Sequence, residues 1–164
     1  MKRLIAKLLT RFPSLAKPFI MLYRPVESDS IPWTLVQKPL HHSRIAIVTT
    51  AGVHQKNQVA FNMRDIHGDP SFRVIDGTKA ASDFMITHDY YDHTDADRDI
   101  NIVFPIGRLR EFESEGIIGQ LADTHYGFMG HIRGPHIETL VRKSAPEVAR
   151  RLKAGVDAVL LTPG

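Results

Sequence analysis

The chain has 164 residues, of which 43% are hydrophobic and 24% are charged. This length suits one domain that buries roughly 70% of its extended surface, and the apolar fraction excludes a disordered chain. Cysteine is absent, so these residues hold no disulfide, thiolate zinc site, iron–sulfur cluster or cysteine nucleophile. No stretch approaches the 18 or more apolar residues that a membrane-spanning helix needs.

Positive charge is concentrated at the start of the chain. Residues 1–24 carry no acidic side chain and six basic ones: Lys2, Arg3, Lys7, Arg11, Lys17 and Arg24. The rest of the chain is slightly acidic, so the net charge of +3 belongs to this N-terminal arm. Because the excess positive charge is confined to this arm, the basic net charge does not indicate nucleic-acid binding. Basic and aromatic residues are also not interleaved as they would be on a nucleic-acid-binding surface.

The arm also has apolar residues at helical spacing. They are Leu4, Ile5, Leu8, Leu9, Phe12 and Leu15. Pro13 and Pro18 interrupt the pattern, so we expect short amphipathic segments rather than one long helix. Such a segment most often packs on its own domain or on a partner subunit, but a basic amphipathic helix also suits contact with an anionic membrane. A secretory signal is disfavoured, because the apolar run is short and no small-residue cleavage site follows.

Residues 25–43 hold three prolines and Trp33, and we interpret them as an extended connector in which Trp33 anchors the chain to the domain surface. Residues 44–164 then form the predicted domain. Its expected elements are strands at 44–48, 72–75, 126–129 and 156–161, a helix from Pro105 to Gly116, and a helix capped by Ser144 and ended by Gly155.

The alternation of strands and helices predicts an α/β domain with a mostly parallel, Rossmann-like sheet flanked by helices. Ligands in such sheets bind at the carboxyl ends of the strands. Two of these ends are residues 49–52 and residues 162–164. Residues 53–99 are otherwise expected to form long polar loops.

The densest group of functional side chains lies at residues 88–99, with two histidines and five aspartates. His88, Asp92 and His93 could bind a divalent metal in a metal-dependent hydrolase. The aspartates could instead structure turns, or contact a substrate. His54 follows the first strand end, where either a catalytic or a structural histidine fits. Asp69 and Arg73 could pair with each other in a turn or bind an anionic substrate.

Four stretches in order, residues 46–54, 68–73, 99–106 and 146–164, resemble the selenoprotein B family of glycine, sarcosine, betaine and D-proline reductases. The similarity covers about residues 32–164 and is nearest to the short selenocysteine subunit of the D-proline reductases. In that family a strand ending in a Thr-x-Gly turn is followed directly by selenocysteine or cysteine. The resemblance therefore implies that Thr162 and Gly164 present a nucleophile that would come after Gly164. It also implies a C-terminally truncated chain, as results when a UGA codon is taken as stop.

For the whole protein the resemblance implies reductive cleavage of a carbon–nitrogen bond in a small-molecule amine. The amine would be held by a pyruvoyl group on a partner subunit, and this chain would carry no cofactor of its own. From their placement, we expect His54 to donate a proton and Asp69, His88 and Asp92 to line the substrate pocket. A non-catalytic scaffold subunit remains an alternative.

Two further expectations follow. The chain is expected to be cytoplasmic. A final strand left without covering helices predicts exposed apolar surface or a homo-oligomer.

Overall fold

The computed structural model of the chain describes residues 2–15, 17–22 and 34–164. The arm contains helix α1 (Lys2–Arg11) and the short helix α2 (Lys17–Leu22). As expected from the prolines, α1 ends before Pro13. Trp33 and most of the predicted connector lie outside the described residues, and the part that is described ends in a 3-10 turn at Leu40–His42.

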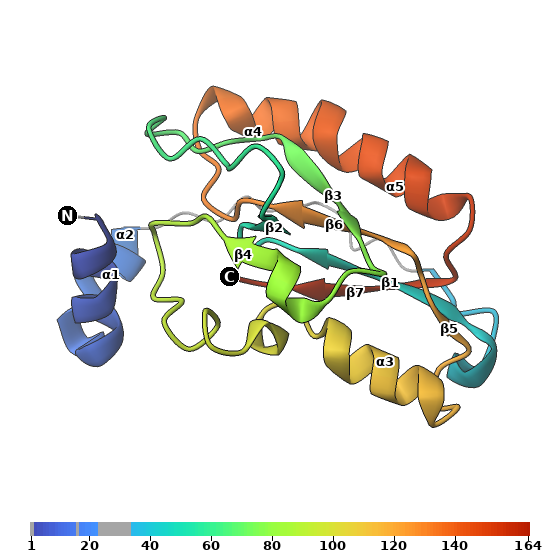
Figure 1. The fold of residues 1–164 in the computed structure, drawn as a ribbon. Helices are drawn as coiled ribbons and strands as arrows, with labels where there is room; N and C mark the ends of the chain where they lie inside the picture. The colour runs from blue at the N-terminus through green and yellow to red at the C-terminus, as the bar shows by residue number, and fades with distance from the viewer. Residues whose placement is uncertain (1, 16, 23–33) are drawn as a thin grey trace.

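The main sheet has five strands: β1 (Arg44–Thr49), β3 (Phe72–Asp76), β5 (Gln120–Leu121), β6 (Thr124–Phe128) and β7 (Ala158–Thr162). Strand β1 is central, because Ile45 pairs with both Leu121 and Ala158 and a strand has only two sides. One side of β1 is occupied by β5 and then β6, and the other by β7 along its whole length (Figure 1). Strand β3 lies beyond β6.

The sheet is mixed. Strands β5, β6 and β7 run parallel to β1, whereas β3 is antiparallel to β6. Strands β2 (Val53–Gln55) and β4 (Phe84–Ile86) form a separate antiparallel pair. The predicted mostly parallel sheet is therefore wrong, and a Rossmann-like order is not confirmed. The physical reason is that β3 follows a long loop rather than a helical crossover, so nothing imposes a parallel direction on it.

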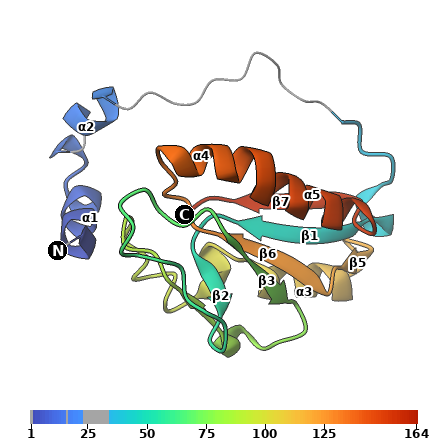
Figure 2. The same cartoon turned by 90° about the horizontal axis from the view of Figure 1, so that it is seen from above.

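Helices cover both faces of the sheet, which confirms the α/β class. Helix α3 (Ile106–Ser114) lies on one face, and α4 (Pro135–Thr139) and α5 (Ala145–Lys153) lie on the other (Figure 2). Alternate side chains of β1 enter the two cores: Ile45 and Ile47 pack in the cluster with α3, and Ala46 packs in the cluster with α5. Burial on both faces explains the continuous apolar run of β1.

The C-terminal helix begins earlier than predicted. Helices α4 and α5 are joined by a π-helical turn at Leu140–Ser144, so Ser144 lies inside a continuous helical segment. Its backbone is helical and its side chain makes no capping hydrogen bond, so the predicted N-cap is wrong. Pro146 has no N–H to donate, and the wider turn before it accommodates that missing bond.

The other predicted elements are present with small shifts. Helix α3 starts just after Pro105, and the positive φ of Gly116 follows its end. Strand β7 starts at Ala158. Just before it, the carboxylate of Asp157 accepts one hydrogen bond from the Arg44 backbone N–H and pairs with Lys38. The expected exposed apolar surface is found on β7, where Leu161 is 72% exposed. Within the described residues, no helix has the length and apolar character to span a membrane.

Candidate functional site at the ends of β1 and β7

Strands β1 and β7 end side by side, because Thr49 pairs in register with Thr162. The hydroxyl groups of both threonines donate to one acceptor, the carbonyl oxygen of Val103, at 3.0 Å and 2.7 Å. A carbonyl oxygen has two lone pairs and can accept both bonds. The two strand ends are thereby fixed to the segment that leads into α3.

Beyond the threonines, backbone packs directly on backbone. A Cβ atom on Gly164 would lie 2.3 Å from the Cα atom of Ala51, so only glycine fits there. The N–H of Thr50 donates to the carbonyl of Thr162 at 2.9 Å. The hydroxyl of Tyr91 donates to the carbonyl of Ala51 at 3.1 Å. Ala51 therefore joins the end of β7 to the loop that carries Tyr91.

Gly52 brings a second part of this loop to the strand ends. Its φ of 75° is in the left-handed region, and a Cβ atom there would lie 2.5 Å from the carbonyl oxygen of Thr87. The carbonyl of Gly52 accepts the N–H of Thr87 at 2.9 Å. His88 follows directly, and its Cβ is among the atoms nearest to Gly52. Glycine at position 52 thus permits the close approach of residues 87–88.

His88 is buried, with 3% of its surface exposed. Its Nδ1 accepts the backbone N–H of Tyr90 at 3.1 Å, so the proton of the neutral ring lies on Nε2. Burial, together with the nearby His131 and His93, lowers the pKa of His88 from 6.5 to about 4, against a smaller opposing effect of Asp89. The ring also contacts Tyr91, with centroids 4.8 Å apart. His88 is therefore a neutral imidazole at pH 7 that offers an N–H group.

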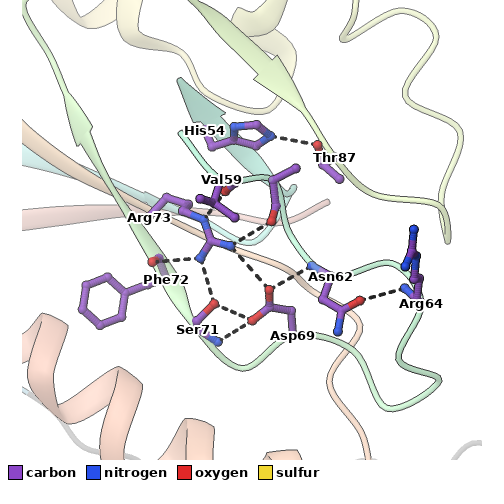
Figure 3. Close-up of polar contacts among 10 residues, drawn as sticks. His54, Val59, Asn62, Arg64, Asp69, Ser71, Phe72, Arg73 and Thr87 are labelled. Atoms are coloured by element: carbon purple, nitrogen blue, oxygen red, sulfur yellow. Dashed lines mark hydrogen bonds and ion pairs between the residues drawn. The ribbon is translucent and has the colours of Figure 1, made fainter. Parts of the chain in front are cut away.

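His54 lies on β2, and both of its ring nitrogens have hydrogen-bond partners. Figure 3 shows its contact with Thr87. Its Nδ1 is 2.8 Å from the carbonyl oxygen of Gln55, and its Nε2 is 2.8 Å from the hydroxyl of Thr87. Because Nδ1 must donate to the carbonyl, Nε2 accepts the Thr87 hydroxyl. Burial lowers the pKa of His54 below its ordinary value. The proton-donor role stays a prediction, and it requires Thr87 to release Nε2.

Asp69 and Arg73 pair with each other, within a network that we call the Arg73 clamp (Figure 3). The guanidinium donates to Asp69 and to four other acceptors: the carbonyl oxygens of Val59, Ala60 and Phe72 and the hydroxyl of Ser71. Burial alone would raise the pKa of Asp69, but hydrogen bonds from Ser71 and the Asn62 N–H, together with the charge of Arg73, outweigh it and lower the pKa. Of the two uses predicted for this pair, the structure shows the turn-stabilising one.

The three residues of the alternative metal site, His88, Asp92 and His93, each contact a different neighbour. Asp92 accepts hydrogen bonds from the backbone and hydroxyl of Thr94, which lower its pKa. His93 Nδ1 lies 2.8 Å from a carboxylate oxygen of Asp97. Among the described residues, no group of three histidine or carboxylate side chains is placed to hold a metal ion.

The structure thus brings Thr162, Gly164 and His88 to one edge of the sheet, with His54 linked to it through Thr87. Asp69 belongs to the Arg73 clamp and Asp92 to the loop beside α1. Sequence reasoning missed two contributors. Tyr91 lies in the histidine- and aspartate-rich run, but nothing in the sequence indicates its bond to Ala51. Val103 contributes a backbone carbonyl, which no side-chain pattern can predict.

Comparison with known proteins shows the family of the chain. The family model for glycine/sarcosine/betaine reductase selenoprotein B matches residues 1–164. The chain belongs to this family. Of the similar proteins, the D-proline reductase subunit gamma of Acetoanaerobium sticklandii is 44% identical to the chain over 144 residues. The glycine reductase complex component B subunit gamma of Symbiobacterium thermophilum is 31% identical over 150 residues, and the betaine reductase complex component B subunit beta of Peptoclostridium acidaminophilum is 27% identical over 146.

The selenoprotein B relatives are longer than this chain. The match to the D-proline reductase subunit covers 87% of this chain and 57% of the relative, and the match to the glycine reductase subunit covers 89% and 34%. All three relatives are named as subunits of multi-subunit reductases. No solved structure matches the chain.

Proposed function

We propose that this chain forms part of a subunit of a selenocysteine- or cysteine-dependent reductase that cleaves a carbon–nitrogen bond in an amino acid or amine. Membership of the selenoprotein B family supports the reaction class. The observation that carries the placement is the joint end of β1 and β7, where the hydroxyls of Thr49 and Thr162 share the carbonyl of Val103.

The proposed reaction adds two electrons and two protons to the carbon–nitrogen bond. The carbon takes one hydrogen in place of the nitrogen, and the nitrogen takes the other, so that it is released as ammonia or a free amine, or stays in the product as an amino group when the bond lies in a ring. The electrons come from a selenol and a thiol, which are oxidised together to a selenide–sulfide bond. None of the 164 residues is a cysteine, so we place both groups in polypeptide outside them. A selenolate is the attacking species, as an activated thiolate is in cysteine enzymes.

In this proposal a pyruvoyl group on a partner subunit holds the amine, and the residues of this chain position and protonate. The shared carbonyl of Val103 fixes the turn at residues 162–164. The close packing of Gly164 on Ala51 leaves no room for a side chain there. His88 supplies an N–H donor that stays uncharged at neutral pH, which suits a group facing an anionic selenolate.

The test uses the full-length subunit with its partner subunits, supplied with a dithiol and with D-proline, glycine, sarcosine or betaine. We expect consumption of one of these substrates. Failure to consume any of them contradicts the proposed reaction.

Thr162→Val tests the placement. It removes one hydroxyl bond, so we expect kcat to fall while the free energy of unfolding drops by only about 1 kcal/mol. Thr78→Val is the matched control, because the Thr78 hydroxyl bonds Asp76 in a surface turn. An equal loss of kcat in both variants would contradict the placement of the site.

A further inference from the structure

Helix α1 exposes the apolar side that a globular protein normally buries. Leu4, Ile5 and Leu8 are 72%, 53% and 51% exposed. Just beyond the helix, Phe12 and Leu15 are also exposed. These five residues fall within residues 4–15, the part of the chain that Figures 1 and 2 place to one side of the α/β domain.

The patch occupies one side of α1. At 100° per residue, Leu4, Ile5 and Leu8 fall within one arc of the helix, and Ala6 and Lys7 fall outside it. Ala6 is buried. Lys7 and Leu4, at the border of the arc, line a cavity of about 190 Å³ together with Asp92 and Asp97. Helix α1 therefore faces the domain along the border of the arc marked by Leu4 and Lys7, and Ile5 and Leu8 remain exposed.

Charge indicates what covers the arc. Residues 1–24 carry six basic side chains and no acidic one. Of these, Lys7, Arg11 and Lys17 are described as exposed. An occupant must therefore be apolar at its centre and negatively charged around it. Acidic lipids at the surface of a bilayer meet both conditions, and each nearby basic residue strengthens the attraction.

We propose that α1 is an interfacial helix that lies in the surface of an anionic membrane, with Leu4, Ile5 and Leu8 inserted among the acyl chains. Its ten residues span about 15 Å, half the thickness of the hydrocarbon core, so the helix lies in the plane of the surface. This inference is independent of the proposed reductase chemistry. It assigns the arm a role in holding the domain beside a membrane.

The experiment is flotation of the 164-residue chain with vesicles of phosphatidylcholine, with and without about one-third phosphatidylglycerol. We expect binding to the anionic vesicles, weaker binding to the neutral ones, and loss of the difference as salt rises and screens the charges. The double variant Ile5→Gln/Leu8→Gln should bind about tenfold more weakly or worse. Its matched control is Leu35→Gln/Val36→Gln, which changes two exposed apolar residues outside the arm.

A second variant pair tests the charge. Arg11→Gln/Lys17→Gln should lower binding to anionic vesicles about tenfold and leave binding to neutral vesicles unchanged. Lys56→Gln/Lys143→Gln removes the same charge from the domain and should have little effect. Absence of binding, or equal loss in arm and control variants, overturns the proposal. So does self-association that Ile5→Gln/Leu8→Gln abolishes without any vesicle binding, because the arc would then be covered by a second copy.

Discussion

The Arg73 clamp and the ends of β1 and β7 are both polar regions beside turns, but they use their hydrogen-bonding groups differently. In the clamp, the guanidinium of Arg73 has five donors and all five have partners within residues 59–73. At the strand ends, two hydroxyls converge on one carbonyl, and bare backbone packs between Gly164 and Ala51. A network that satisfies itself stabilises a loop. An edge of bare backbone beside a neutral histidine can present a reactive group.

The largest effect should come from breaking the clamp. Arg73→Met leaves the carboxylate of Asp69 half-buried without its cation, and it removes the bonds to the 59–60 loop. We expect the free energy of unfolding to fall by about 3–5 kcal/mol in urea titrations. Arg98→Met is the control, since Arg98 and Asp95 form an exposed pair, and it should cost no more than about 1 kcal/mol. Equal losses in the two variants would show that the clamp adds nothing.

The next prediction concerns how the protonation of His88 changes the stability of the fold with pH. The folded-state pKa of His88 is lowered from 6.5 to about 4, so the unfolded state binds its proton first as pH falls. The stability contributed by the neutral ring is complete above pH 6.5 and is lost between pH 6.5 and about 4. His125, in the core, has the same shift for the same reason of burial. We expect each to contribute a loss on the order of 2–3 kcal/mol across this range.

Denaturant titrations at a series of pH values measure this loss. His88→Gln should reduce the loss of unfolding free energy at low pH by the amount that one buried histidine contributes. His41→Gln changes an exposed histidine and should leave the pH dependence unchanged. A curve that His88→Gln does not alter would contradict the neutral, buried state of this ring.

The smallest effect concerns the glycine that admits residues 87–88 to the strand ends. Gly52 and Gly116 both have positive φ, of 75° and 70°, but only Gly52 has a neighbour where a Cβ would go. Gly116→Ala should cost about 1 kcal/mol for its backbone alone. Gly52→Ala should cost about 1–2 kcal/mol more, because the methyl group meets the Thr87 carbonyl. Equal melting temperatures for the two variants would mean that the loop moves away freely.

The sequence predicted those parts of the fold that local patterns specify. The run at 44–48 and the proline and glycine around α3 have direct local signatures, and the structure has the corresponding elements. The direction of β3 has no local signature in the sequence, because it depends on pairing with β6, which lies about fifty residues further along the chain. The β2–β4 pair was missed for a related reason: each strand has three residues, too few for alternation to show.

The candidate site was predictable only in outline. The rule that ligands bind at the carboxyl ends of strands pointed to residues 49–52 and 162–164, which do meet. It could not show that Asp69 is held by Arg73, nor that His54 has partners at both ring nitrogens. Those assignments depend on contacts between loops. The side-chain types alone suit a structural role and a chemical role equally well.

The π-helical turn between α4 and α5 sets the rotational phase of the whole C-terminal helix. In a regular helix Leu140 and Val148 would point about 80° apart, whereas one extra residue in a turn brings them near the same direction. Both pack in the same apolar cluster, together with Leu152. Deleting a single residue from 141–144 would restore regular hydrogen bonding and leave Leu140 and Val148 about 20° apart, because they would then be separated by seven residues of regular helix. Among natural variants of this domain, one-residue gaps should therefore be tolerated in this turn and selected against within α5, where they would rotate Val148 away from Leu152.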